Sequence, residues 1–323
     1  MRFLNRNQDY YRGYYSKRNY RHLYKVATFF VTYGLVAYIL ICFFLYFRQD
    51  YIIYKANDRI SASSPGDRDF QLDHQDVWID VIQSNARIHG WWFSAPGLNK
   101  PVIAIPNEPV NILTTPKTIL YFCGRGSSKT HYNNLARIKG FQQLGFSVLA
   151  IDYRGYGLSE GALPNETRLY EDGQAAWVYL TNKKQIAAKD VVIYGESLGG
   201  AIAIDLAVKQ SNAAGVIVQS SFTSMTKQIG QIRPALKIFP LKVIINQRFN
   251  SIDKVRSLST PVLFIHGTAD TVVDYKMSRE LYYAAPEPKT LFYIPDAEHL
   301  RLYKPGKYSY LSAIENFINQ DNK

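Results

Sequence analysis

The feature that most constrains the fold of this 323-residue chain is a serine set between glycines at the junction of two contrasting segments. Residues 191–194 form a β-branched and aromatic run typical of a strand, and residues 201–207 are small and apolar, as in a buried helix. Between them, Gly195 and Gly199 flank Ser197, which predicts a nucleophile elbow, a turn that presents a reactive hydroxyl. We expect Ser197 to adopt backbone angles that most residues avoid, and a Cβ on either glycine would strike the neighbouring strand or helix. The alternative is a chance match in an ordinary turn.

A serine hydroxyl needs a base to take its proton and a third group to orient that base. Downstream of Ser197, two strand-like runs each lead to a loop with a suitable side chain. Residues 260–265 lead to Asp270, and residues 290–295 lead to His299. The order serine, acid, histidine is the one expected for this kind of elbow. We therefore predict that Asp270 is the orienting acid and His299 is the general base.

Other histidines and acids lie close to these positions in the sequence. His266 stands at a strand end and is expected to be a structural hydrogen-bonding residue. His131 follows an earlier glycine loop and would break the expected order if it were the base. Asp274 is expected to cap or solvate the next helix, and Glu298 is expected to point away from the adjacent histidine. Both acids remain alternatives as the orienting group.

An oxyanion hole needs two N–H donors near the acyl carbonyl. Leu198 supplies one from the start of the helix after the serine. The second is expected in the loop after the predicted strand 117–122, where Gly124 and Gly126 let the backbone approach the substrate. We predict the N–H of Arg125 as that donor and both glycines as substrate-binding residues. The alternative is a glycine turn that binds no ligand.

Taken in order, the glycine loop, residues 152–161, the elbow and the loops with the acid and the histidine resemble the serine α/β-hydrolases. The resemblance covers about residues 75–320. It is strongest to the membrane-anchored α/β-hydrolase-domain group, which includes monoacylglycerol lipases, lysophospholipid lipases and protein depalmitoylases. It implies a serine hydrolase that cleaves carboxylic acyl esters, of a lipid or a thioester, without a cofactor.

One departure from the family pattern lies in the glycine loop. Members usually carry His-Gly-Asn there, whereas this chain has Cys123-Gly124-Arg125. A backbone donor does not depend on its side chain, so the oxyanion hole should survive. The Arg125 side chain either recognises an anionic group on the substrate or is a solvated or salt-bridged arginine.

Alternation of strand and helix patterns independently predicts an α/β fold with a mostly parallel sheet covered by helices on both faces. A strand pair at 77–81 and 88–93 is expected before the alternation begins. The later predicted strands are 119–122, 148–152, 191–194, 216–219, 262–265 and 291–294, and residues 171–180 have helical spacing. Ligands bind at the carboxyl ends of such strands, where the three predicted catalytic loops would meet.

Residues 26–47 contain no charged residue, and about 20 apolar residues suffice to span a bilayer. We predict a transmembrane helix there, with a cleaved signal peptide or a buried core helix as alternatives. Residues 1–25 carry seven basic residues and one acidic residue, which predicts a cytoplasmic N-terminus and a hydrolase domain on the other side. The tail could bind anionic headgroups. Nucleic-acid binding is the less favoured reading of this tail.

The expected layout is therefore a basic tail (1–25), a span (26–47), a linker (48–75) and a hydrolase domain (76–323) with a short cap at about 223–250. The cap either covers the site and meets the bilayer or is an ordinary packed helical excursion. Cys42 and Cys123 cannot pair with each other, so no disulfide framework is expected, and no Cys or His cluster suggests a metal. Alternatives to the esterase are a serine peptidase or amidase on the same fold and a non-catalytic membrane receptor or scaffold.

Overall fold

The structure is a computed structural model that describes residues 5–54, 64–96, 117–126, 129–303 and 307–320. The chain divides into two compact units, residues 1–48 and 49–323, which are described separately below. Helix α1 (Asn5–Tyr54) begins in the first unit and ends in the second.

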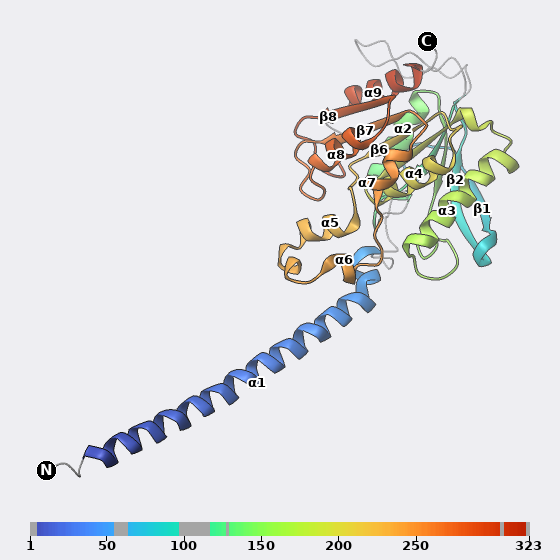
Figure 1. Ribbon diagram of the computed structural model, residues 1–323. Coiled ribbons are helices and arrows are strands. Elements are labelled where there is room, and N and C mark those ends of the chain that lie inside the picture. The colour runs from blue at the N-terminus through green and yellow to red at the C-terminus, as the bar shows by residue number, and fades with distance from the viewer. Residues whose placement is uncertain (1–4, 55–63, 97–116, 127–128, 304–306, 321–323) are drawn as a thin grey trace. The chain divides into compact units, whose positions relative to one another are not determined.

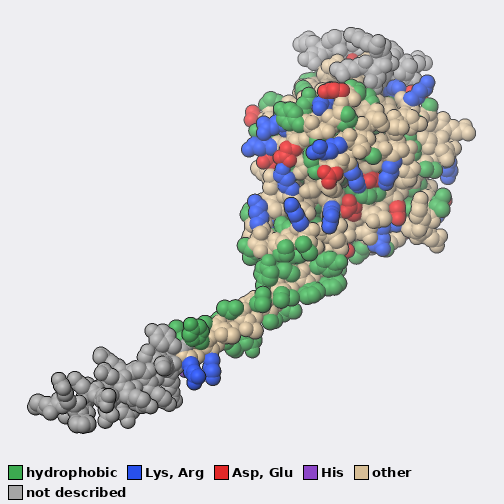
Figure 2. Space-filling view, viewed as in Figure 1, with side chains coloured by type: hydrophobic (Ala, Val, Ile, Leu, Met, Phe, Trp, Pro, Cys, Tyr) green, Lys and Arg blue, Asp and Glu red, His purple; other side chains and the backbone are tan. Residues whose placement is uncertain are grey.

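Within α1, residues Arg21–Tyr51 are long and apolar enough to cross a membrane. Large apolar side chains along this stretch are exposed, and Figure 2 shows them in green on the helix. The predicted span 26–47 lies inside this stretch. By length and composition, such a helix fits either a membrane span or a signal sequence.

A single sheet of eight strands forms the centre of the second unit, in the order β1-β2-β4-β3-β5-β6-β7-β8 (Figure 1). Strand β2 pairs antiparallel with β1 and β4, and every other neighbouring pair is parallel. The strands are β1 (Gln75–Val81), β2 (Ala86–Phe93), β3 (Thr118–Phe122), β4 (Ser147–Ile151), β5 (Val191–Glu196), β6 (Gly215–Gln219), β7 (Val262–Gly267) and β8 (Lys289–Ile294). The predicted mostly parallel sheet is confirmed, and the predicted strand pair, β1 and β2, lies at one edge of it.

Helices cover both faces of this sheet, as predicted. On one face, α2 (Tyr132–Gln143) and α9 (Lys307–Gln320) join the core cluster with alternate strand residues such as Tyr121 and Tyr194. On the other face, α3 (Glu166–Val178) packs against α4 (Leu198–Lys209), and α7 (Ser251–Lys254) contacts both α4 and α8 (Lys276–Ala284). The strands are continuous apolar runs because both of their faces are buried.

The segment between β6 and β7 contains the predicted cap. It consists of α5 (Met225–Ile232), the 3-10 turn η4 (Pro234–Ile238) and α6 (Leu241–Ile244). Met225 and Ile229 are buried, whereas Ile238 and Val243 are 71% and 75% exposed. The cap therefore packs inward and also presents apolar side chains outward.

The stretch assigned above to a linker, 48–75, is structured in part. Residues Gln49–Tyr54 are the last turns of α1, and Tyr54 is only 1% exposed. Gln49 Oε1 accepts the backbone N–H groups of Asn246 at 3.0 Å and Gln247 at 3.2 Å, which ties this end of α1 to the chain just after α6. Farther along, Phe70 is buried in the core cluster. Residues 55–63 lie outside the described part of the chain.

Candidate active site

Ser197 lies between the end of β5 and the start of α4, on the turn that we predicted from its flanking glycines. Its φ is 53° and its ψ is −114°, a left-handed conformation that a serine rarely adopts. A Cβ added to Gly195 would lie 2.1 Å from the Gly199 carbonyl oxygen, and one added to Gly199 would lie 2.2 Å from the Phe122 carbonyl oxygen. Ser221 Oγ donates to the Ser197 carbonyl oxygen at 2.8 Å. The elbow is thus fixed by close backbone packing and by a side-chain hydrogen bond.

Asp270 follows β7 and accepts hydrogen bonds at both carboxylate oxygens. Oδ1 accepts the N–H groups of Val272 and Val273, each at 2.8 Å. Oδ2 lies 2.7 Å from His299 Nδ1 and 3.0 Å from His266 Nε2. Burial alone would raise the pKa of Asp270, but the bonds from the two histidines and from the backbone outweigh it and hold the pKa well below its ordinary value. Asp270 is therefore a carboxylate at neutral pH.

His266 is a structural neighbour of this carboxylate. Its Nε2 lies 3.0 Å from Asp270 Oδ2 and 3.0 Å from the Val273 carbonyl oxygen, both of which only accept. Nε2 must therefore carry a proton, and in the neutral ring Nδ1 accepts from the Ser278 hydroxyl at 2.6 Å. The sequence indicated a structural hydrogen-bonding role for His266, but nothing in it pointed to the contact with Asp270.

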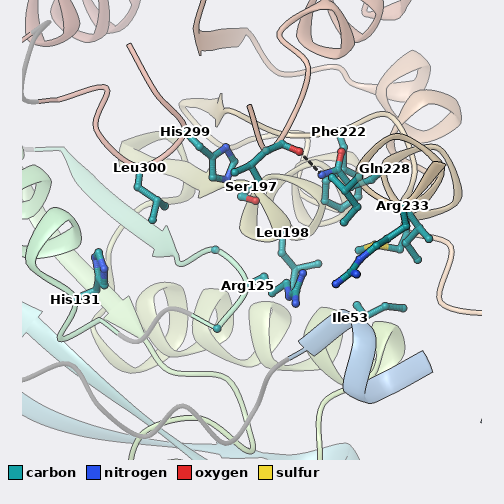
Figure 3. A pocket seen from close by; sticks show the side chains of 16 residues that line it. Ile53, Arg125, His131, Ser197, Leu198, Phe222, Gln228, Arg233, His299 and Leu300 are labelled. Carbon is teal, nitrogen blue, oxygen red and sulfur yellow. Dashed lines mark hydrogen bonds between the residues drawn. The ribbon is translucent and has the colours of Figure 1, made fainter. Parts of the chain in front are cut away.

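His299 follows β8 and uses its other nitrogen differently. Because Asp270 only accepts, His299 Nδ1 donates to it, so the lone pair of the neutral imidazole lies on Nε2. Ser197 and His299 both line one cavity of about 300 Å³, and Figure 3 shows the imidazole beside the serine. The structure thus brings the three predicted catalytic residues together from the ends of β5, β7 and β8.

The predicted oxyanion loop lies directly against the elbow. A Cβ added to Gly124 would lie 3.3 Å from Ser197 Cβ, so only a short gap separates the two chain segments. Leu198 is the first residue of α4, and the first N–H groups of a helix have no intrahelical acceptor. Gly124, Arg125, Gly126 and Leu198 all line the cavity. The loop and the start of α4 therefore share the cavity wall with Ser197, where the sequence predicts an oxyanion hole.

The alternative residues have other partners. His131 lines the same cavity but its Nδ1 accepts the Asn133 N–H at 3.3 Å as the cap of α2, and burial lowers its pKa. Asp274 Oδ1 accepts the Lys276 N–H at 2.9 Å. Glu298 lies 3.8 Å from Arg301. Among the described residues, no group of three or more His, Cys, Asp or Glu side chains could hold a metal ion.

A buried polar network lies behind the elbow, and the sequence did not predict it. Arg137 on α2 is fully buried and pairs with Glu196, the residue before the predicted nucleophile. Arg137 also donates to the Tyr121 hydroxyl at 3.0 Å and to Asn134 Oδ1 at 2.6 Å. Breaking such a buried ion pair on one side is costly, because the other charge is left without a partner. This network therefore fixes the end of β5 from the α2 face.

Comparison with known protein families gives a match over most of the second unit. The family described as serine aminopeptidase, S33 matches residues 114–256 and 244–305. The uncharacterized Mycobacterium tuberculosis protein MT2364 is 32% identical over 283 residues, which cover 86% of this chain and 89% of that protein. Human alpha/beta hydrolase domain-containing protein 17B is 34% identical over 177 residues, which cover 54% of this chain and 57% of the human protein.

Solved structures show the same fold. An esterase of Pyrococcus furiosus superposes with a TM-score of 0.64 at 19% identity and covers 81% of this chain and 94% of its own. An α/β-hydrolase from Penicillium superposes with a TM-score of 0.59 at 16% identity, over 77% of this chain and 99% of its own. At these identities the likeness concerns the fold alone.

Proposed function

Since this chain belongs to the serine aminopeptidase S33 family of α/β-hydrolases, we propose that it is a membrane-anchored serine hydrolase that cleaves carboxylic acyl esters or thioesters. The observation that carries the proposal is the 2.7 Å hydrogen bond from His299 to Asp270, with His299 and Ser197 on the wall of one cavity. The strained turn at Ser197 adds to it, because such strain clusters at functional sites.

The reaction that this geometry supports is acyl transfer through a serine ester. His299 Nε2 takes the proton of Ser197 while Oγ bonds to the acyl carbon, and Asp270 stabilises the imidazolium. The N–H groups of Arg125 and Leu198 hold the oxygen anion of the tetrahedral intermediate. The carbonyl re-forms as the bond to the leaving alcohol or thiol breaks, and His299 returns its proton to that group. Water then attacks the acyl-enzyme by the same steps.

The lining of the cavity favours an acyl chain as part of the substrate. Beyond the predicted catalytic residues, the described lining is largely apolar: Ile53, Phe222, Met225, Ile229, Ile232, Val272 and Leu300. Cavities of this kind bind the apolar part of a ligand, and a few polar groups orient its reactive part. A lipid ester or an acyl thioester meets both requirements.

The helix Arg21–Tyr51 supports the anchoring part of the proposal. Its charge-free centre matches the thickness of a bilayer, and the basic residues before it favour a cytoplasmic N-terminus. The hydrolase unit would then work on the non-cytoplasmic side, close to membrane substrates.

An aminopeptidase is the second candidate, because the family description names that activity. An aminopeptidase must bind a free α-ammonium group, which needs a carboxylate or another acceptor at the end of its cavity. The described lining contains no Asp or Glu and contains Arg125 and Arg233 instead. This charge disfavours a cationic substrate terminus. A non-catalytic receptor would need neither the strained serine nor the ordered histidine.

Labelling with a fluorophosphonate probe tests the proposal. The full-length protein in neutral detergent should be labelled, and Ser197→Ala should not be. Ser312→Ala, on α9 and outside the described cavity lining, is the matched control and should be labelled like the wild type. Equal labelling of the Ser197→Ala protein, or no labelling of a folded wild type, would exclude the mechanism. Hydrolysis of 4-nitrophenyl butyrate against an aminoacyl-nitroanilide separates the esterase from the aminopeptidase.

A further inference from the structure

The charge of the cavity is the feature that the proposed reaction leaves unexplained. Two arginines line it, and they come from separate parts of the chain. Arg125 lies in the loop after β3, whereas Arg233 ends α5 in the cap. Among the described lining residues there is no Asp or Glu. Acyl transfer needs only the N–H of Arg125, so neither guanidinium is required by the chemistry.

The backbone at the end of α5 places Arg233 at the cavity. Its N–H donates to the Ile229 carbonyl oxygen at 2.9 Å, which closes the last turn of the helix, and Pro234 begins the next turn. Its side chain is exposed, and among the described residues it forms no ion pair. In Figure 3 the Arg233 side chain extends from the cap in the direction of Arg125, above Ile53.

The surroundings of Arg125 place its charge at the same end of the cavity. Arg125 lines the same cavity as Arg233 and Ile53, and its neighbour in the loop, Gly126, lines it as well. The Tyr156 hydroxyl donates to the Tyr54 carbonyl oxygen, next to the cavity-lining Ile53.

We propose that Arg125 and Arg233 bind an anionic group, a phosphate or a carboxylate, carried by the acyl substrate. Guanidinium groups donate in a planar fork that matches both anions, and they stay charged at any physiological pH. The acyl carbonyl would lie at Ser197 and the chain along the apolar wall, with the anion between the loop and the cap. This proposal rests on the proposed function, and it narrows the substrate class to anionic acyl esters such as lysophosphatidates.

The test compares substrates that differ only in the anionic group. 1-Hexanoyl-glycerol-3-phosphate and 1-hexanoyl-glycerol share the acyl chain and are soluble, so binding to a lipid surface does not contribute. The measured quantity is the ratio of their kcat/KM values for the full-length protein in neutral detergent. Arg125→Gln and Arg233→Gln should each lower this ratio by about tenfold or more, since each removes a charged hydrogen bond. Hexanoyl-lactate is the third substrate and distinguishes carboxylate from phosphate recognition.

Matched variants separate a local site from general charge effects. Arg256→Gln removes an exposed arginine that is outside the described cavity lining, and it should leave the ratio unchanged. Arg233→Lys keeps the charge without the fork and should fall between the wild type and Arg233→Gln. An unchanged ratio for both glutamine variants with both anions, or an equal fall for Arg256→Gln, would overturn the proposal.

Binding to an inactive protein makes the two proposals fail separately. Calorimetry with Ser197→Ala should show tighter binding of 1-hexanoyl-glycerol-3-phosphate than of 1-hexanoyl-glycerol, and adding Arg233→Gln should lower this preference by about tenfold or more. If binding shows this preference but no ester is hydrolysed, the proposed function fails and the anion site stands. If the neutral ester is hydrolysed through Ser197 without any preference, the anion site fails and the hydrolase stands.

Discussion

Replacing Asp270 by asparagine should block proton transfer to His299 while the fold stays nearly unchanged. Asp270 Oδ1 accepts the N–H groups of Val272 and Val273, each at 2.8 Å. An asparagine must place its carbonyl oxygen there, because its NH2 group donates and does not accept. The NH2 group then occupies the Oδ2 position, which lies 2.7 Å from His299 Nδ1 and 3.0 Å from His266 Nε2, so the hydrogen bond that His266 donates is lost as well.

In that position the amide donates to Nδ1, so the proton of the imidazole moves to Nε2. Nε2 is the nitrogen that must accept the proton of Ser197, and a triad histidine in the wrong tautomer lowers kcat by about 10⁴-fold. Stability should fall as well, since a hydrogen bond to a charged group contributes about 1.5–3 kcal/mol. The pKa of Asp270 is lowered in the folded state. The stabilisation from the Asp270 carboxylate is therefore fully present above the pKa of the unfolded state. It is lost only as the pH falls through the pKa of the folded state. The difference in unfolding free energy should thus be constant at neutral pH and shrink in strong acid.

The assay is kcat for 4-nitrophenyl butyrate, with thermal unfolding measured on the same samples. Asp274→Asn is the matched control, because Asp274 Oδ1 accepts the Lys276 N–H and an asparagine oxygen can accept it equally well. It should retain nearly the full kcat. If Asp270→Asn keeps more than a few per cent of kcat and still unfolds cooperatively, the tautomer argument is refuted. Equal losses in the two variants would leave the acid unassigned.

Three further changes test the site and the boundary of the hydrolase unit. Ser197→Ala should lower ester turnover by about 10⁴- to 10⁶-fold without changing the melting temperature; residual activity of more than a few per cent would place the nucleophile elsewhere. His299→Ala should lose comparable activity in the same assay, whereas His266→Ala should lose less activity and more thermal stability; the reverse order would overturn the assignment. A chain that begins at Gln49 should unfold at a higher temperature than one that begins at Lys55. The shorter chain lacks the buried side chains of Ile53 and Tyr54, and burial of the isoleucine alone is worth about 1.5–3 kcal/mol; equal melting would show that they add no stability.

The sheet could be predicted because its strands are buried on both faces. Residues 191–194 are all fully buried, so an unbroken apolar run was the right signal for β5. Strand β8 begins at Lys289, two residues before the predicted start, because its first residues are only partly buried and their polarity resembles a loop. The elbow was predictable for a steric reason. Only glycine fits at 195 and 199, where a Cβ would lie within 2.2 Å of a carbonyl oxygen.

The polar network behind the elbow could not be predicted. Arg137 and Glu196 are 59 residues apart, and nothing in either local pattern marks a fully buried charge. An arginine on a helix usually lies at the surface, so the sequence favours a solvated side chain there. The contact between His266 and Asp270 is similar, since it depends on how the loop after β7 turns back toward the strand. Pairings of this kind arise from tertiary packing and leave no periodic signal.

The sequence did not predict that α1 continues to Tyr54, because the composition after the span indicates a linker whereas the side chains there are buried. Residues 61–67 are rich in small and polar residues, which extended the predicted linker back to 48. Yet Ile53 and Tyr54 are 2% and 1% exposed, and the Tyr54 hydroxyl donates to Gln247 at 2.8 Å. A linker is free to move only where its side chains have no partners. The last turns of α1 therefore belong to the hydrolase unit.

The sequence left two interpretations of the cap open, a cover that meets the bilayer or an ordinary packed helical excursion, and the structure of the cap explains why. Ile229 and Ile244 are buried, so the segment is a packed helical excursion, yet Ile238 and Val243 are more than 70% exposed. Lys237 and Lys242, the neighbours of these exposed residues in the sequence, are exposed too. Exposed apolar side chains beside basic ones are typical of surfaces that contact anionic membranes. The two interpretations are therefore compatible, because one segment can pack on the cavity through its inner side and present a different chemistry on its outer side. A mixed apolar and basic pattern broken by prolines is what such a segment requires.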